Sequence, residues 1–224
     1  RCTSTSRVIL LKGIAEPFIK NLVTLTDQLQ IGFAFDKGVF MGPLISEKAQ
    51  ERFFHYQELA AEERAEIILE GHTLARERPG YYVSPAIHLV KSLNPNSKYQ
   101  QEEIFAPDIA LYIASDLMEA INIANQSPYG LAVSIFTNNK GFYKEVLYSC
   151  KAGVINWNRA TTGASSRLPF GGIGKSGNHF PTALFAPYYC TYPVASLEGG
   201  VNFAPDKLLP GVNWPAKELE KGRE

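Results

Sequence analysis

The chain has 224 residues, of which 45% are hydrophobic, and its 22 basic side chains balance 22 acidic ones. This content can bury a sizeable core, whereas the zero net charge argues against binding of nucleic acid or of a charged membrane surface. No apolar run matches a bilayer span, and no signal-peptide pattern is present. Cys2, Cys150 and Cys190 are odd in number and widely spaced. This spacing argues against a disulfide framework or zinc site and favours a reducing, cytoplasmic setting.

The first predicted elements are a strand and two helices. The apolar run RVILL over 7–11 predicts a buried strand. In the next element, a helix, Pro17 is expected in the first turn, with apolar side chains at helical spacing until Gly32 ends the run. Ser46 is a suitable N-cap for a second helix over 47–63.

Strand and helix signals then alternate through the middle of the chain. Two strands are predicted first, over 65–71 and 81–90, and Pro85 interrupts the second. A strand-helix-strand-helix-strand series comes next, with Ser115 as the cap of its first helix. Its elements are expected over 109–113, 116–125, 131–136, 140–150 and 154–156. Short connections favour parallel pairing with right-handed crossovers within this series, and the chain is predicted to be α/β.

Residues 159–177 are rich in Gly, Ser and Thr and predict a loop. Gly172, Gly174 and Gly177 match the spacing of a dinucleotide-binding turn, but that turn requires a strand before it and a helix after it. Here SSRLPF precedes the glycines, and prolines interrupt the segment after them. We therefore interpret the glycines as allowing a tight loop with positive φ angles and close backbone approach.

Five motifs occur in the order and spacing found in the C-terminal half of the NAD(P)-dependent aldehyde dehydrogenases, which the chain resembles over 2–198. They are RCTSTSR, QEEIFAPDIAL, SPYGLAVSIFT, AGVINWN and LPFGGIGKSG. The details NWN, TTGASS and YYCTYPVASLE most resemble the branch that oxidises succinylglutamate semialdehyde in arginine breakdown. Ala106 stands where the family usually has Gly, and Phe180 stands where that branch has a basic residue.

The resemblance implies a catalytic domain over 1–188, an oligomerisation strand over 189–198 and a C-terminal arm over 199–224. It also implies a mostly parallel sheet flanked by helices, a small-molecule aldehyde as substrate, and a homo-oligomer. The family's general base, oxyanion asparagine and dinucleotide-binding domain all precede the position of Cys2. We therefore expect this chain to be a piece of a working dehydrogenase and to be inactive by itself. The absence of an initial Met favours this hypothesis. A free-standing, non-catalytic polypeptide that acts through the family's assembly surfaces is the alternative.

The resemblance assigns Cys2 as the catalytic nucleophile. Its thiolate would attack the aldehyde to give a thiohemiacetal, hydride would leave to the nicotinamide, and the thioester formed would be hydrolysed. The Cys2 N–H would contribute one donor to the oxyanion hole. By itself a lone cysteine is more often an inert, small apolar residue, but the downstream motifs favour the nucleophile. Cys150 and Cys190 are interpreted as structural.

Glu103 matches the acidic residue that binds a ribose of the cofactor in this family. The expected cofactor is NAD, and NADP is the open alternative. A carboxylate can accept two hydrogen bonds from a ribose diol. Phe105 matches the aromatic residue beside the nicotinamide ring, and Glu102 is expected to be a solvated or structural acid. On the alternative interpretation, EEIF is only the start of a strand with Phe105 in the core.

The loop NRATTGASS is the expected substrate anchor. In relatives that act on amino-acid-derived semialdehydes, this loop holds the distal carboxylate through backbone amides, and Gly163 and Ala164 fit that role because small residues expose their N–H groups. Arg159 and Arg167 could add positive charge, although a solvated surface charge is the favoured interpretation of each. The 4 histidines are scattered, so no metal site is predicted.

Overall fold

The computed structural model describes residues 1–200 and 210–212, which leaves most of the predicted arm over 199–224 outside the described residues. The chain divides into two units, Arg1–Tyr189 and Cys190–Glu224. The helices are α1 (Lys12–Asp27), α2 (Glu47–Glu62), α3 (Lys98–Gln101), α4 (Leu117–Asn125), α5 (Lys140–Ser149) and α6 (Ala186–Cys190). The strands are β1 (Arg7–Leu11), β2 (Glu66–Leu69), β3 (Ala86–Val90), β4 (Asp108–Ala114), β5 (Tyr129–Gly130), β6 (Ala132–Ile135), β7 (Val154–Trp157), β8 (Pro169–Phe170), β9 (Ile173–Gly174) and β10 (Thr182–Ala183).

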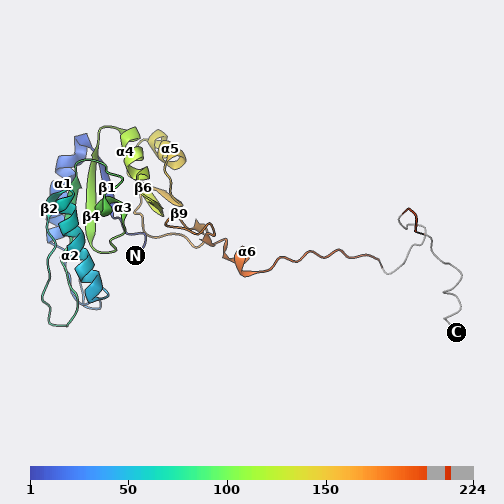
Figure 1. Cartoon of the computed structure of the whole chain (residues 1–224), viewed down its shortest axis with the longest axis horizontal. Helices are drawn as coiled ribbons and strands as arrows, with labels where there is room; N and C mark the ends of the chain where they lie inside the picture. The colour runs from blue at the N-terminus through green and yellow to red at the C-terminus, as the bar shows by residue number, and fades with distance from the viewer. Residues whose placement is uncertain (201–209, 213–224) are drawn as a thin grey trace. The chain divides into compact units, whose positions relative to one another are not determined.

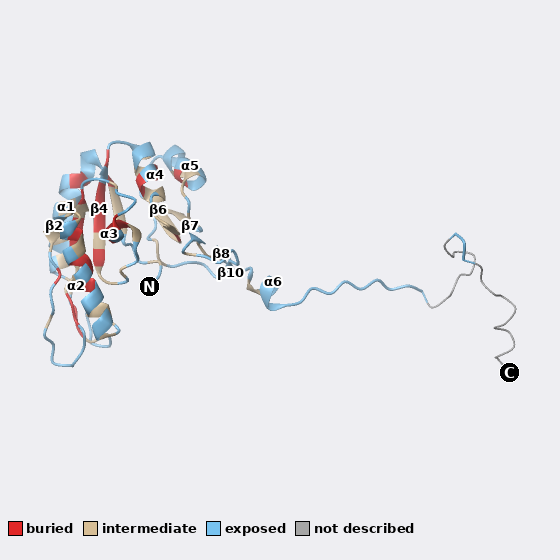
Figure 2. Cartoon of the chain, in the orientation of Figure 1, coloured by how far each residue is buried: buried red, intermediate tan, exposed pale blue. Residues whose placement is uncertain are grey.

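A four-stranded sheet lies at the centre of the first unit, with strand order β1-β4-β3-β2 (Figure 1). Strands β1, β4 and β3 are parallel, and β2 is antiparallel to β3. The predicted α/β class with a mostly parallel sheet is confirmed. The central strand β4 is buried along most of its length because it is paired on both edges and covered by side chains. Figure 2 shows the buried residues gathered along β4 and on the neighbouring part of α2. The main core cluster consists of Tyr56, Ala60, Val90, Tyr99, Ala110, Tyr112, Ala114 and Ile123.

The predicted series from β4 to β7 is present, but part of its strand pairing is wrong. β6 pairs in parallel with β7, as expected, in a separate two-stranded ladder. β4 pairs instead with β1 and β3. Since these two strands occupy both hydrogen-bonding edges of β4, no edge remains for β6.

The first helix begins earlier than its sequence predicts. α1 starts at Lys12, directly after β1, so Pro17 lies inside the helix and not in its first turn. The helix ends at Asp27, before the expected stop at Gly32. No loop separates the strand from the helix, because Leu11, the last residue of β1, is also the N-cap of α1. Its side chain makes no capping hydrogen bond. No capping residue in the sequence marks this start.

Two helix caps show how local signals succeed and fail. Ser46 caps α2 as predicted, since its side chain accepts a hydrogen bond from the Ala49 N–H. The cap of α4 is Asp116 and not Ser115, because the Asp116 carboxylate accepts from the Glu119 N–H at 2.9 Å. Ser115 instead donates its N–H and its hydroxyl to the Glu119 carboxylate, and these two bonds lower the pKa of Glu119. The arrangement resembles a capping box, except that Glu119 accepts from the residue before the N-cap.

The predicted oligomerisation strand over 189–198 is not a strand in the single chain. Its first two residues, Tyr189 and Cys190, end helix α6, and residues 191–200 are exposed and have no helix or strand. An edge strand is completed only when a partner supplies hydrogen-bonding groups. The strand therefore stays a prediction for the assembled protein.

Candidate functional site

Cys2 lies exposed in the turn that precedes β1. A distant residue holds this turn in place: the Thr161 hydroxyl donates to the Thr3 carbonyl oxygen at 2.6 Å, across 158 positions of sequence. The Thr161 and Thr5 hydroxyl oxygens are 3.0 Å apart. These two contacts bring the Cys2 turn against the predicted anchor loop over 158–166.

The loop presents Gly163 and Ala164 at the surface. Gly163 has φ +85°, in the left-handed region that favours glycine. Within the described part of the chain, neither backbone N–H donates a hydrogen bond. Free N–H groups beside a left-handed residue can bind an anion. Arg159 and Arg167 are exposed and form no ion pair with another described residue, which agrees with the interpretation of both as solvated charges.

The turn between α3 and β4 distinguishes the two adjacent glutamates. The Tyr56 hydroxyl donates to the Glu102 carboxylate, and Arg52 donates to the backbone carbonyl oxygen of Glu103. Burial and the bond to Glu102 raise the pKa of Tyr56 to about 12, so its hydroxyl stays protonated at neutral pH. The Glu103 carboxylate is exposed and accepts no hydrogen bond from the described residues. Phe105 is 62% exposed with φ 56°, so it does not lie in the core.

The Cys2 turn and the turn over 102–107 lie at the same end of the sheet. Cys2 precedes β1 and Glu103 precedes β4, and these strands are parallel neighbours with Arg7 paired to Ala110. The Ala110 N–H donates to the carbonyl oxygen of Ser6 at 3.0 Å, which extends the pairing toward Cys2. Because the amino ends of parallel neighbours lie at the same edge, the thiol, the free carboxylate and the exposed ring share one end of the sheet, to which Thr161 connects the anchor loop.

The residues at this edge fit part of a dinucleotide. An exposed carboxylate can accept hydrogen bonds from a ribose diol, and the exposed Phe105 ring two residues further on offers a flat apolar surface for a nicotinamide. The glycine-rich loop does not fit the pyrophosphate, since the two-residue strand β10 comes after it in place of a helix.

The glycines of that loop have the structural role predicted for them. Gly174 has φ +57°. A Cβ atom on Gly177 would lie 1.8 Å from the carbonyl oxygen of Gly172. β9, within the loop, pairs antiparallel with β5, and the Lys175 N–H donates to the Pro128 carbonyl oxygen at 2.9 Å. The loop thus joins two of the five motifs through close backbone contact.

The three cysteines differ in accessibility, and we expect iodoacetamide to alkylate Cys2 and Cys190 well before Cys150. Cys2 and Cys190 are exposed, whereas Cys150 is half-buried at the end of α5 and burial raises the pKa of its thiol. A raised pKa leaves less thiolate at a given pH, and the thiolate is the species that reacts. A time course of peptide mass spectra at mildly alkaline pH measures the order, with Cys150→Ser as the control that leaves the fast phase unchanged. Equal rates at all three sites would contradict the expectation.

Other elements of the site had no signal in the sequence. Thr161, Arg52 and Tyr56 contact residues that are 158, 51 and 46 positions away, respectively. Their roles depend on those contacts, which no local pattern encodes. In the described ranges, no three His, Cys, Asp or Glu side chains are grouped to hold a metal ion. None of the helices described there combines the length and the apolar character of a membrane span.

Comparison with known proteins gives consistent matches. The model of the aldehyde dehydrogenase family matches residues 1–187. An N-succinylglutamate 5-semialdehyde dehydrogenase of Legionella pneumophila (strain Corby) is 39% identical over 214 residues, which are 95% of this chain and 42% of that protein. The enzyme of the same name from Acinetobacter baylyi is 37% identical over 95% of this chain and 43% of its own length. The chain thus spans less than half the length of these curated relatives.

Solved structures show the same fold. A 1-pyrroline-5-carboxylate dehydrogenase from Thermus with bound NAD aligns with a TM-score of 0.74 at 29% identity, over 82% of this chain and 34% of that one. An aldehyde dehydrogenase from Bacillus cereus aligns with a TM-score of 0.73 at 31% identity, over 81% of this chain and 36% of its own.

Proposed function

The chain belongs to the aldehyde dehydrogenase family, and we propose that it is the nucleophile-bearing part of an NAD-dependent enzyme that oxidises N-succinylglutamate 5-semialdehyde to the carboxylic acid. The relatives that carry this activity in their names support the choice of substrate. The observation that carries the proposal is the contact of Thr161 with Thr3, which joins the Cys2 turn to a loop where the Gly163 and Ala164 N–H groups donate to no described residue. An aldehyde with a distal carboxylate matches such a pair of sites.

The chemistry assigned to this chain begins at Cys2. Its thiolate forms a bond to the aldehyde carbon, and the carbonyl oxygen takes the negative charge, which the Cys2 N–H stabilises as a hydrogen-bond donor. Bound NAD supplies the acceptor for the hydride that the thiohemiacetal loses. Water then adds to the resulting thioester, the carbon–sulfur bond breaks, and Cys2 leaves as thiolate while the acid forms. Glu103 would hold the cofactor ribose, Phe105 would offer an apolar surface to the nicotinamide ring, and Gly163 and Ala164 would hold the distal carboxylate.

Steady-state kinetics of the full-length enzyme over a panel of aldehydes tests the function. The proposal expects the highest kcat/KM for N-succinylglutamate 5-semialdehyde, with NAD preferred over NADP, and no turnover by this chain alone. Addition of a separately expressed N-terminal half is expected to restore some activity. The alternative function is that of a non-catalytic polypeptide acting through the family's assembly surfaces, and the exposed apolar side chains near the C-terminus favour it, among them Tyr188, Tyr192, Val194 and Leu197. A full-length protein that oxidises no aldehyde on the panel would favour this alternative.

A substitution in the anchor loop separates acidic from neutral substrates. Gly163→Val in the full-length enzyme is expected to lower kcat/KM for the semialdehyde on the order of tenfold more than for a neutral aliphatic aldehyde, because only the acidic substrate loses charge-assisted contacts. The open space around Gly163 means that the damage arises from the left-handed backbone, which valine disfavours, and not from a clash. Gly199→Val is the matched control, since Gly199 is also exposed in open space. Equal losses for the two substrates would indicate general misfolding of the loop.

A further inference from the structure

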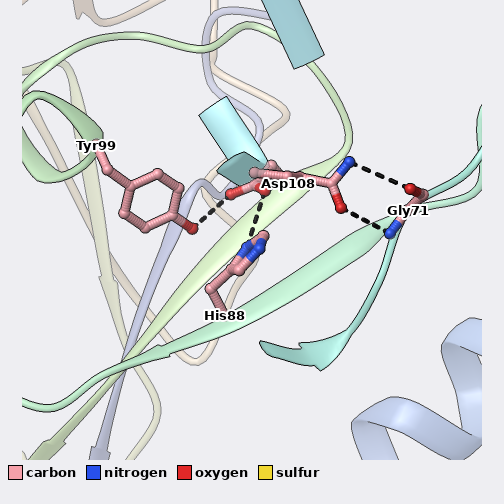
Figure 3. Close-up of polar contacts among 5 residues, drawn as sticks. Gly71, His88, Tyr99 and Asp108 are labelled. Atoms are coloured by element: carbon pink, nitrogen blue, oxygen red, sulfur yellow. Dashed lines mark hydrogen bonds and ion pairs between the residues drawn. The ribbon is translucent and has the colours of Figure 1, made fainter. Parts of the chain in front are cut away.

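A polar network lies in the buried core of the sheet (Figure 3). His88 on β3 is 0% exposed, and its Nδ1 lies 3.0 Å from the Oδ2 of Asp108, the first residue of β4. The Tyr99 hydroxyl in α3 donates to the other carboxylate oxygen of Asp108 at 2.7 Å. Burial and the neighbouring carboxylate raise the pKa of Tyr99, so its hydroxyl acts as a donor. The Tyr99 ring also packs edge-on against His88, with 5.3 Å between the ring centroids.

Burial of this network costs free energy, and packing alone does not explain why it is present. Removing a carboxylate and an imidazole from water costs free energy, and well-packed apolar residues at such positions are often as stable or more so. The strand residues paired with the two are apolar and buried, since Ala86 on β3 is paired with Asp108 and Ala110 on β4 is paired with His88. None of the chemistry assigned to Cys2 or to the anchor loop uses these three side chains.

The location of the network indicates what it does. Tyr99 precedes the turn over 102–107 and Asp108 comes directly after it, so their hydrogen bond closes the segment that carries Glu103 and Phe105. His88 contacts the same carboxylate from β3 and so connects the closed segment to the sheet. Phe105 has φ 56°, a backbone conformation that a bulky residue rarely adopts and that its surroundings must hold in place. The closure supplies that support.

Helix α2 holds the same segment from its other side. The Glu63 carboxylate, at the end of α2, accepts hydrogen bonds from the backbone N–H of Lys98 at 2.9 Å and of Tyr99 at 3.3 Å. The bonds from α2 to both glutamates of the turn continue this support. The helix is itself tied to the sheet region, because the Gln57 amide bonds both the N–H and the carbonyl oxygen of Gly71 at 2.7 and 3.2 Å (Figure 3). Contacts with α2 and Glu63 therefore hold α3 and the glutamates of the turn, and the buried network joins the residues on either side of the turn.

We propose that His88, Tyr99 and Asp108 are positioning residues whose buried network fixes the turn over 102–107 so that Glu103 and Phe105 face outward at the sheet edge. The part of this inference that rests on the proposed function is that the turn binds the cofactor. The three residues touch neither substrate nor cofactor and act through the backbone of the turn.

The test uses two variants and a matched control in the full-length enzyme. Tyr99→Phe removes only the hydroxyl and keeps the ring against His88, and Asp108→Asn keeps the shape of the side chain while removing its charge. Tyr82→Phe is the control, since Tyr82 is 2% exposed and Tyr99 is 4% exposed, but Tyr82 lies outside the turn. Amide hydrogen exchange of the peptide over 102–107 is measured without cofactor, and the NAD dissociation constant is measured by calorimetry.

In both test variants, the exchange rate of the turn amides and the NAD dissociation constant are each expected to rise on the order of tenfold. The value of kcat at saturating NAD is expected to change little. Tyr82→Phe is expected to change neither the exchange rate nor the dissociation constant. Faster exchange with unchanged NAD affinity would keep the positioning role and reject the cofactor role proposed for Glu103 and Phe105. Unchanged exchange in Tyr99→Phe would overturn the inference. Tyr99→Phe decides the matter if Asp108→Asn does not fold.

Discussion

Replacement of Cys2 by serine is expected to abolish aldehyde oxidation by the full-length enzyme and to leave NAD binding nearly intact. The serine hydroxyl is far less ionised than a thiol at neutral pH, so the attacking species is lost. Loss of a nucleophile lowers turnover by at least about a thousandfold. Because Cys2 is exposed in a turn, the change removes no buried packing that would confuse the result. NADH absorbance measures turnover, and calorimetry measures NAD affinity.

The other two cysteines are the controls for this experiment. Cys190→Ser changes an equally exposed thiol outside the proposed site, and Cys150→Ser changes a half-buried thiol at the end of α5. Both variants are expected to retain most of the activity. Appreciable oxidation by the Cys2→Ser enzyme would show that Cys2 is not the nucleophile.

Gly177→Ala is expected to cause a large loss of stability although Gly177 lies outside the proposed site. Its Cβ atom would lie 1.8 Å from the carbonyl oxygen and 2.6 Å from the carbonyl carbon of Gly172. Backbone atoms cannot rotate away as a flexible side chain does, so the loop must rearrange, at a cost of about 3 kcal/mol or more in the free energy of unfolding. Thermal unfolding of the full-length enzyme measures the loss.

Gly13→Ala is the matched control for Gly177→Ala. Gly13 lies in α1, and an added Cβ atom has no neighbour within 4 Å. Alanine is a better helix former than glycine by up to about 1 kcal/mol, so this variant is expected to be as stable as the natural sequence or slightly more stable. If Gly177→Ala unfolds at the same temperature as Gly13→Ala, the loop is not packed as tightly as the structure indicates.

Local sequence patterns were sufficient for most of the elements and for the family. The run over 7–11 forms β1, and Ser46 caps α2, because each depends on residues within a few positions of one another. The five motifs identified the aldehyde dehydrogenase family through their order along the chain. The same motifs marked Cys2, Glu103 and Gly163 as site candidates, whose roles remain predictions.

Only the tertiary structure decided how these elements combine. β4 takes β1 and β3 as neighbours in preference to β6. The Glu102 carboxylate accepts from Tyr56, while the Glu103 carboxylate accepts no hydrogen bond from the described residues. The buried contact of His88 with Asp108 has no signal in the sequence, since each residue taken alone resembles an ordinary polar residue in a strand. The physical reason is the same in each case. Strand pairing and polar side-chain contacts join groups that are distant along the chain, so their partners are determined by packing and not by neighbouring residues.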